Sequence, residues 1–445
     1  MESTVKTYTY SDGTIQRIQL VRPDSWEALE FLNLRYADGA LDCFERIFRQ
    51  YLIPACPWIF GHLVLFHIPR GLKIPFSHQT QYGTVADDLT AAAAALKSGL
   101  KIVGGKPVFR DARVEQFWNQ LQEQDCIRIV SGKLPTTQFI PVGDAPGFLS
   151  QTETEANLKV NASFFIMDPF DCASVFDHVG TCLGLMVKNG VVTNPPLYGR
   201  EALLVRKNGA VTVEQPDIRK TDIVINGIPY RHGSNASIYT RPERIATPRS
   251  SGKQLVIVGT TVAAVAEQGR TPIPASGFVL CPEGACSVLP GDTVTYLGME
   301  DVSFGIQVGN SIVRNGVKTE RFVSRFYNIR HLEPVPFPPS LYPMDFKGGR
   351  AARIALGADA QGKPMLLWAE GAPKLGYLPG THSRGASLSD MADICTDVGM
   401  VNAVNLDGGG SAQMLLNNRR FLEISDRNPD HSESERPVPN ALIIR

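Results

Sequence analysis

The sequence has few cysteines and lacks paired metal ligands. Eight cysteines are spread over 445 residues, and none of them forms a Cys-x-x-Cys pair. This spacing excludes a zinc ribbon and is too sparse for a disulfide scaffold. The eight histidines show no metal-ligand spacing either, so we expect no metal and no other cofactor. We interpret Cys281 and Cys286 as thiols, because a disulfide between them would need an oxidising compartment.

The chain also lacks an excess of charge of either sign and a long apolar run. It has 44 basic and 44 acidic residues, whereas broad binding to nucleic acid needs a basic surface. The longest apolar stretch, residues 57–69, is too short to span a bilayer. The N-terminus has no basic start followed by an apolar run, so no export signal is visible. We therefore expect no nucleic-acid partner, no membrane span and a cytoplasmic location; the sequence does not indicate the oligomeric state.

The pattern of residues divides the chain into two predicted domains. Residues 25–51 have helix-like apolar spacing, residues 85–100 are alanine-rich, and residues 113–124 favour a third helix. We found no chemistry-bearing motif there, so residues 1–125 are predicted to be a largely helical accessory domain of unknown function. Residues 126–445 are predicted to form the larger domain. A fragment beginning near Asp125 is then expected to be soluble on its own.

The larger domain is predicted to be mostly antiparallel sheet. Short β-like runs from residue 179 to about 317 are separated by Asn-Gly pairs at 189–190, 208–209 and 315–316, which favour tight hairpins. Residues 333–343 contain five prolines, which exclude a helix or a central strand there. We interpret this stretch as a connector, with a lid over a ligand as the alternative.

The last hundred residues are predicted to read strand–helix–strand. Residues 352–357, 364–369 and 401–406 favour strands, Ser387 and Asp390 resemble a capping box, and Gly399 is placed to end the helix. The predicted fold class is mixed α/β, with α+β character. It has a large, mainly antiparallel sheet, a C-terminal β–α–β unit and an appended helical N-terminal domain.

The sharpest motif is Asn-Leu-Asp-Gly-Gly-Gly-Ser at residues 405–411. Three glycines at the end of a predicted strand let the backbone approach a ligand closely, and successive amides of such a turn can bind an anion. The spacing matches neither a dinucleotide fingerprint nor a phosphate loop. By itself the motif could be a flexible hairpin connection. Asp407 at the strand end favours a functional site, because sites occur at that location in α/β folds.

The blocks around this motif resemble the phosphodiester glycosidase family from about residue 130 to the C-terminus. The resemblance is carried by VNAVNLDGGGSAQMLLNN, by RIALGADAQGKPMLLWAEG before it, by ERPVPNALIIR after it and by VNASFF at residues 160–165. It implies hydrolysis of a sugar-1-phosphate diester at the anomeric carbon, which releases a free sugar and a phosphomonoester. The implied partner is a small glycosyl phosphodiester or a glycan substrate.

The resemblance also implies roles for single residues. Asp407 is the catalytic candidate, because a carboxylate can stabilise an oxocarbenium-like state or activate water. Arginine offers planar, bidentate donors that suit phosphate. The implied substrate-binding residues are Asn161, Arg353, Gly408, Gly409, Gly410, Ser411 and Arg436. The sequence departs from the family pattern at Ala162 and Ser163, which replace two glycines, and at Ile354, which replaces a threonine.

Simpler interpretations of these residues stay open. Arg353 can be a structural salt-bridge residue, Arg436 can pair with its acidic neighbours, and Asn161 can satisfy backbone groups at a strand end. A second carboxylate is expected but not singled out; the candidates are Glu435, Asp171 and Asp177. Two other functions are also open: a glycoside hydrolase acting on an unphosphorylated oligosaccharide or polysaccharide, and a non-catalytic carbohydrate-binding protein.

Overall fold

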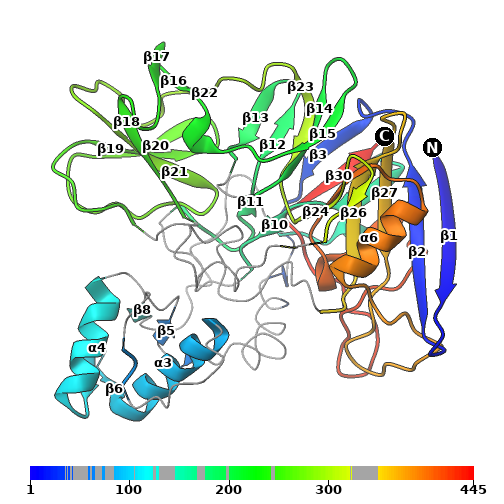
Figure 1. Ribbon diagram of the computed structural model, residues 1–445, viewed down its shortest axis with the longest axis horizontal. Coiled ribbons are helices and arrows are strands. Elements are labelled where there is room, and N and C mark those ends of the chain that lie inside the picture. Colours follow the sequence, from blue (N-terminus) through cyan, green and yellow to red (C-terminus); the bar gives the residue numbers. More distant parts are fainter. Residues whose placement is uncertain are drawn as a thin grey trace.

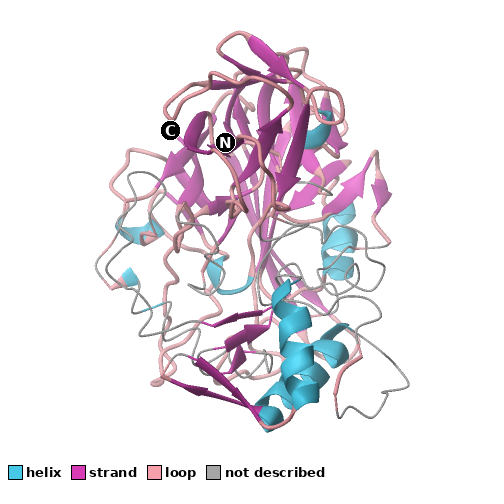
Figure 2. Cartoon of the chain, turned by 90° about the vertical axis from the view of Figure 1, so that its left-hand side faces the viewer, coloured by secondary structure: helices cyan, strands magenta, loops and turns pink. Residues whose placement is uncertain are grey.

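Strands predominate in the computed structural model of the chain (Figures 1 and 2). No helix among the described residues is long and apolar enough to cross a membrane. The described residues are 1–35, 37, 39–40, 43, 59–60, 63–65, 73–75, 85–104, 106–123, 127–129, 146–167, 176–196, 200–241, 246–320, 322 and 349–445. The proline-rich stretch at 333–343, predicted to be a connector or a lid, lies outside this set.

The largest sheet has seven strands and combines both ends of the chain. Its order is β1-β2-β27-β26-β28-β24-β25, and each neighbouring pair is antiparallel. The strands are β1 (Glu2–Thr9), β2 (Ile15–Arg22), β24 (Ser311–Arg314), β25 (Val317–Lys318), β26 (Arg353–Ala358), β27 (Pro364–Ala369) and β28 (Asn402–Asn405). Every residue of β26 and β27 is buried, which explains why their sequences are almost continuously apolar.

The prediction of a helical N-terminal domain is wrong for the first 33 residues. β2 pairs with β27, and β3 (Leu29–Asn33) pairs with β30 (Asn440–Ile444) near the C-terminus. The helix-like spacing from residue 25 failed because Leu29 and its neighbours meet hydrogen-bonding partners from the far end of the chain. Such long-range pairing overrides local helical preference.

The helices predicted at residues 85–100 and 113–124 are confirmed as α3 (Val85–Gly99) and α4 (Ala112–Glu123). They lie with short strands at one end of the molecule, apart from the large sheets (Figure 1). These strands are β4 (Ile59–Phe60), β5 (Leu63–Leu65), β6 (Leu100–Val103), β7 (Lys106–Phe109) and β8 (Ile127–Ile129). A separate accessory domain therefore remains a prediction only for the region of α3 and α4. Strand β8 lies beyond its predicted boundary at residue 125.

The middle of the chain forms several antiparallel sheets instead of one large sheet. A four-stranded sheet, β29-β9-β30-β3, and a five-stranded sheet, β13-β12-β23-β14-β15, lie nearest the C-terminal strands. Their strands are β9 (Leu158–Asn161), β12 (Met186–Lys188), β13 (Val191–Asn194), β14 (Ala202–Arg206), β15 (Val211–Glu214), β23 (Val302–Ile306) and β29 (Met414–Leu416). The predicted hairpins at Asn189 and Asn315 are confirmed, because both asparagines and the glycines after them have positive φ.

Three further sheets complete the middle region. β16 (Ile223–Ile225), β17 (Ile228–Tyr230) and β22 (Val294–Tyr296) form one of them. β18 (Ala236–Thr240), β19 (Gln254–Val258), β20 (Thr261–Ala266) and β21 (Gly277–Pro282) form the second. The third is the pair β10 (Phe164–Phe165) and β11 (Cys182–Leu183). Short 3₁₀ turns occur at Leu149–Gln151, Ile218–Lys220 and Gly409–Ser411.

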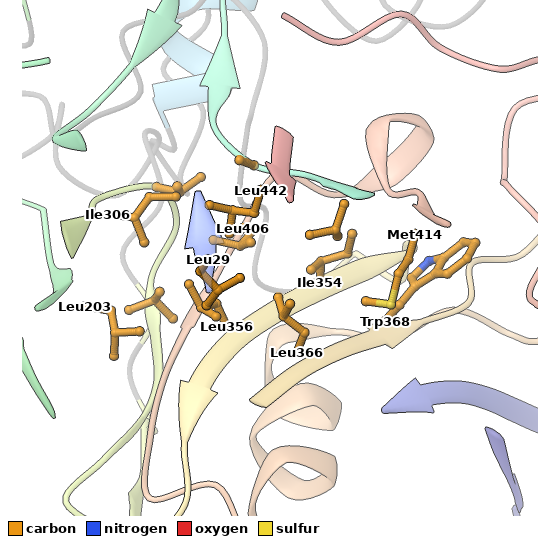
Figure 3. Close-up of a cluster of buried hydrophobic side chains, with 14 of the residues drawn as sticks. Leu29, Leu203, Ile306, Ile354, Leu356, Leu366, Trp368, Leu406, Met414 and Leu442 are labelled. Atoms are coloured by element: carbon orange, nitrogen blue, oxygen red, sulfur yellow. The ribbon is translucent and has the colours of Figure 1, made fainter. Parts of the chain in front are cut away.

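The central strands β26, β27 and β28 of the seven-stranded sheet are buried on both faces, whereas the outer strands β1 and β25 are largely exposed. On one face, Ile354 and Leu356 of β26 pack with Leu442 of β30 and Leu203 of β14 (Figure 3). On the other face, Ala355 packs with residues of α6 (Leu388–Asp397). The predicted capping box is confirmed, since Ser387 and Asp390 cap each other's backbone amides. This two-sided burial holds the ends of β26 and β28 in place, and these ends carry Arg353 and the triple-glycine loop.

Candidate active site

The antiparallel pairing of β26 with β28 brings Asp407 to Arg353. Ala355 lies opposite Asn405, so the end of β28 lies beside the start of β26. The contact continues past the strands, because the amide of Gly409 donates to the carbonyl of Ala352 at 2.8 Å. Arg353 and Asp407 are 54 positions apart in the sequence, and the two motif blocks that contain them therefore meet at one edge of the sheet.

Asp407 is a buried carboxylic acid with an unusual pKa. Its exposed fraction is 7%. Burial raises its pKa to about 7, although a hydrogen bond from the Ser411 hydroxyl and the charge of Arg436 act in the opposite direction. The amide of Gly408 and the charge of Arg353 also favour the ionised form. The carboxyl group is therefore divided between its two protonation states near neutral pH, as a proton-transferring group requires.

The triple-glycine loop is shaped for close packing. Gly409 has a φ of +61°, which favours glycine. A Cβ atom on Gly410 would overlap with Oδ2 of Asp426 and with Arg436, so only glycine lets the loop lie against that ion pair. The loop therefore brings Asp407 next to Arg436.

Several amides of the triple-glycine loop donate to acceptors within the protein. The amides of Gly409, Ser411 and Ala412 donate to the backbone carbonyls of Ala352, Gly408 and Gly409. The Gly408 amide bonds to the carboxylate of Asp407. Substrate contacts by Gly408, Gly409, Gly410 and Ser411 stay a prediction, and the amides of Gly408, Gly409 and Ser411 already have acceptors within the protein.

Asn161 holds the two ends of this loop. Its Nδ2 donates to the carbonyl of Asp407 at 2.8 Å, and its Oδ1 accepts from the amide of Gln413 at 2.9 Å. Gln413 in turn donates through Nε2 to the carbonyl of Arg436 at 2.7 Å. The side chain of Asn161 is 1% exposed and both amide atoms are engaged with backbone. This is the simpler alternative for Asn161, so we assign it to positioning the loop.

Arg353 begins β26, whereas Arg436 lies in the loop before β30, and the two arginines have different contacts. Arg353 donates to the carbonyls of Ala386 at 3.3 Å and Gly349 at 3.1 Å. Arg436 binds Asp426 with two nitrogens, Nε at 2.9 Å and Nη2 at 3.2 Å. Both arginines are buried and both act electrostatically on Asp407. The structure thus brings together Asp407, Arg353 and Arg436, as the motif order suggested.

Sequence reasoning missed two charged residues beside Arg436. Asp426 is 1% exposed, and Lys374 binds its Oδ1 at 2.5 Å. Burial acts to raise the pKa of Asp426, but Arg436 and Lys374 outweigh it and lower that pKa below its ordinary value. Asp426 comes ten positions before Arg436 in the segment after the glycine motif, the one signal that could have found it. No motif includes Lys374.

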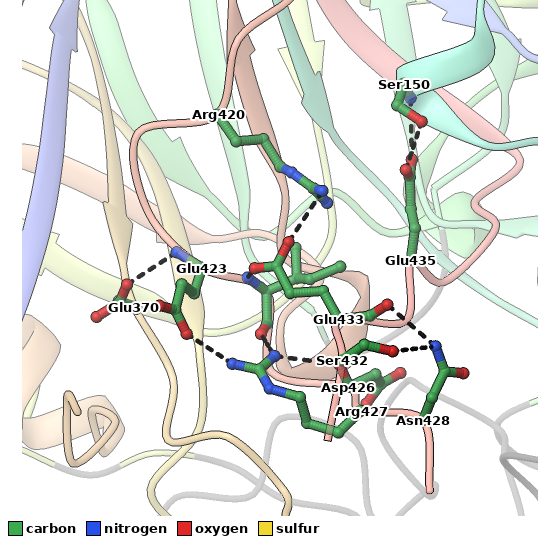
Figure 4. A network of polar contacts seen from close by, with 11 residues as sticks. Ser150, Glu370, Arg420, Glu423, Asp426, Arg427, Asn428, Ser432, Glu433 and Glu435 are labelled. Atoms are coloured by element: carbon green, nitrogen blue, oxygen red, sulfur yellow. Dashed lines mark hydrogen bonds and ion pairs between the residues drawn. The ribbon is translucent and has the colours of Figure 1, made fainter. Parts of the chain in front are cut away.

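Glu370 joins the loops that carry these residues. This buried carboxylate follows β27; its Oε2 accepts from Arg17 at 2.6 Å and from the Ser383 hydroxyl at 2.5 Å. Its Oε1 accepts from the amide of Glu423 at 2.8 Å (Figure 4). Glu423 also binds Arg427, next to Asp426, at 2.7 Å (Figure 4). Glu370 therefore ties β2 to the loops of Ser383 and Asp426.

The expected second carboxylates have other partners. Glu435 accepts from the amide and hydroxyl of Ser150 at 2.9 and 2.5 Å, and buried Asp177 accepts from the amide of Ala275 at 2.7 Å. Asp171 lies outside the described residues. The carboxylate that binds Arg436 directly is instead that of Asp426. The described residues include no group of three or more His, Cys, Asp or Glu side chains that could hold a metal ion.

Comparisons with known proteins match this region. The family model for phosphodiester glycosidase matches residues 154–445. The N-acetylglucosamine-1-phosphodiester alpha-N-acetylglucosaminidases of Mus musculus, Homo sapiens and Bos taurus are each 38% identical over 81 residues. That match covers 18% of this chain and 14% of the length of each of these curated relatives.

Two solved structures are similar at lower identity. A hypothetical protein from Synechocystis has 20% identity and a TM-score of 0.40, over 68% of this chain and 55% of its own. The zebrafish N-acetylglucosamine-1-phosphodiester alpha-N-acetylglucosaminidase catalytic domain, auto-inhibited by its pro-peptide, has 15% identity and a TM-score of 0.33. This second alignment covers 100% of this chain and 82% of that one.

Proposed function

This chain belongs to the phosphodiester glycosidase family, and from that premise we propose that it hydrolyses the glycosidic bond of a sugar-1-phosphate diester. Water attacks the anomeric carbon, and the bond from that carbon to the phosphate oxygen breaks. The bonding electrons leave with the phosphate oxygen, so the products are a free sugar and a phosphomonoester. The proton lost by the attacking water must be accepted by a group in the site.

Asp407 is the group that we assign to this proton. Its pKa of about 7 leaves a substantial ionised fraction at neutral pH and makes it a better base than an ordinary aspartate. The ionised carboxylate also stabilises the positive charge that develops at the anomeric carbon. Ser411 donates to this carboxylate and holds its orientation.

Arg353 and Arg436 are assigned to the phosphate. A phosphodiester carries a negative charge, and a phosphomonoester leaving group gains a second one as the bond breaks. Buried guanidinium groups stabilise such charge strongly, because they are preorganised and poorly screened by water. The observation that carries the proposal is this combination: a buried aspartate with a pKa of about 7, under the influence of two buried arginines, within the segment that matches the family.

The test is a screen of sugar-1-phosphate diesters, including nucleoside diphosphate sugars and alkyl phosphates, with mass detection of the free sugar. The wild type is compared with Asp407→Asn, which keeps the size and removes the charge. We expect turnover by the wild type and a loss of at least about a hundredfold in the variant. Retention of more than about a tenth of the activity would remove Asp407 from the catalytic role.

The same screen separates the other two functions. An aryl glycoside of the same sugar, which carries no phosphate, serves as the matched substrate. Turnover of the aryl glycoside without turnover of any phosphodiester indicates an ordinary glycoside hydrolase. Measurable sugar binding with no turnover of either substrate indicates a carbohydrate-binding protein.

A further inference from the structure

Lys159 is a buried lysine that the proposed mechanism does not use. It lies on β9 and is 1% exposed. Its Nζ donates to the carbonyl of Thr152 at 2.8 Å and to that of Leu149 at 3.5 Å. Burial lowers the pKa of this lysine, although the charge of Glu435 acts to raise it. A buried ammonium group is costly unless it is hydrogen-bonded, so the lysine and these two carbonyls hold each other in place.

The two carbonyls belong to the 3₁₀ turn at Leu149–Gln151 and to the residue that caps its end. A group of opposite charge holds the same turn from another side. Glu435 accepts from the amide and the hydroxyl of Ser150 at 2.9 and 2.5 Å (Figure 4). The turn therefore lies between a lysine and a glutamate, and it connects Lys159 to the residue directly before Arg436.

The chain beyond Arg436 pairs with the same segment. The amide of Gly147 donates to the carbonyl of Val438 at 3.0 Å, and the amide of Val438 donates to the carbonyl of Gly147 at 2.8 Å. Residues 147–152 therefore hold the main chain on both sides of Arg436, at Glu435 and at Val438.

A second connection from β9 reaches Arg436 itself. Lys159 and Asn161 are two positions apart in this strand, so their side chains leave the same face of it. Asn161 accepts from the amide of Gln413 at 2.9 Å, and Gln413 donates to the carbonyl of Arg436 at 2.7 Å. One face of β9 is thus connected to the main chain of Arg436 by two routes, one through each side chain.

We propose that Lys159 is a positioning residue for Arg436, which it holds through the 3₁₀ turn and Glu435. The inference rests on the proposed function, in which Arg436 binds the phosphate of the substrate. A guanidinium group binds phosphate through a planar pair of donors, so its effect depends on its orientation as well as its charge. Without Lys159, the main chain of Arg436 loses one of its two connections to β9. The same inference assigns Glu435 to positioning and not to proton transfer.

Amide hydrogen exchange of the full chain tests this connection without turnover. The variants are Lys159→Met, which removes the ammonium group, and Lys188→Met as the matched control. Lys188 is also a partly buried lysine that donates to backbone carbonyls, at residues 26–29. We expect the amides of Ser150 and Val438 to exchange about tenfold faster or more in Lys159→Met, and to be unaffected in Lys188→Met. Unchanged protection of both amides in Lys159→Met would overturn the proposal.

A double-mutant cycle separates positioning from a general loss of structure. Lys159→Met should lower kcat/KM for the sugar phosphodiester about tenfold in the wild-type background. In an Arg436→Lys background, which lacks the planar pair of donors, the same substitution should cost less than about twofold. Lys188→Met should have the same effect in both backgrounds. Equal losses from Lys159→Met in both backgrounds would show that it acts on the fold as a whole, which contradicts a positioning role.

Glu435→Gln keeps the proposal testable if Lys159→Met does not fold. The glutamine has nearly the size of the glutamate at this half-buried position, but it lacks the charge that faces Ser150 and Lys159. We expect faster exchange of the Ser150 amide and a loss of kcat/KM that is largely absent in the Arg436→Lys background. Abolished turnover in both backgrounds would identify Glu435 as a catalytic carboxylate and would overturn its assignment to positioning.

The outcome can be separated from failure of the proposed function. If the wild type cleaves no sugar phosphodiester, the proposed function fails, and the exchange measurements still decide whether Lys159 holds the chain around Arg436. If the wild type is active but the effects of Lys159→Met and Arg436→Lys are independent, the proposed function stands and the role of Lys159 is refuted.

Discussion

Arg17 Nε donates to Glu370 Oε2 at 2.6 Å, although 353 positions separate the two residues in the sequence. Arg17 lies on β2, and Glu370 follows the adjacent strand β27. The same oxygen of Glu370 binds Ser383, three positions before the carbonyl of Ala386 that accepts from Arg353. The N-terminal hairpin is therefore connected to the proposed site through one buried carboxylate.

Arg17→Met should reduce activity more than its effect on stability explains. Loss of the ion pair leaves Glu370 with weaker partners and loosens the loops that hold Arg353 and Asp426. We expect kcat/KM to fall about tenfold, because misplaced groups lose much of their catalytic effect. The control is Arg206→Met, since Arg206 pairs with Glu214 and Asp301 in the five-stranded sheet. Similar losses of kcat/KM at similar melting temperatures in both variants would contradict a positioning role.

Asp407→Asn should stabilise the protein at alkaline pH. The folded-state pKa of about 7 lies above the ordinary 3.8, so ionisation of Asp407 opposes folding. The wild type should lose stability as pH rises from about 4 to 7, by an amount on the order of 4 kcal/mol. The asparagine variant lacks this loss and should gain relative to the wild type at pH 8 but not at pH 4. Urea unfolding at both pH values measures the difference; a variant that is less stable at pH 8 would refute the raised pKa.

The pH dependence of kcat/KM should have an ascending limb near pH 7. Activity rises as Asp407 ionises, because the proposed base acts in its ionised form and its pKa is about 7. A pH profile of the wild type from about pH 4 to 9 measures this limb. An ascending limb centred near about pH 4, the range of an ordinary aspartate, would contradict the role of Asp407 as the base.

Arg353→Lys and Arg436→Lys should discriminate between substrates. Lysine keeps the charge but loses the planar pair of donors that fits phosphate. We expect each variant to lose about tenfold or more on the sugar phosphodiester and much less on the aryl glycoside. Phosphomonoester product should also inhibit the wild type more strongly than either variant. Equal losses on both substrates would indicate that these arginines hold the fold or the sugar hydroxyls.

A fragment that begins near Asp125 should aggregate, in contrast to the expectation from sequence. Removal of β2 and β3 exposes the edges of β27 and β30, and exposed strand edges promote association between chains. Size-exclusion chromatography of this fragment, beside the full chain, measures the outcome. A soluble monomeric fragment with native-like melting would show that residues 1–33 are dispensable for the core.

Local patterns in the sequence were sufficient for features that depend on neighbouring residues. The capping box at Ser387 and Asp390 and the hairpin turns at Asn189 and Asn315 depend on contacts within a few positions. Such contacts form with the same residues in any fold that contains the element. The motif blocks were also sufficient to predict that Asp407, Arg353 and Arg436 belong to one site.

Tertiary structure alone decided the rest, because it depends on pairs that are distant in the sequence. The strand at Leu29 forms since β30 offers it hydrogen bonds, and the amide of Gly409 is engaged since the carbonyl of Ala352 accepts from it. No motif includes Lys374 or Asp426, and their charges matter because folding brings them together beside Arg436. The pKa of Asp407 has the same origin: the motif identified the aspartate, and its burial raised the pKa to about 7.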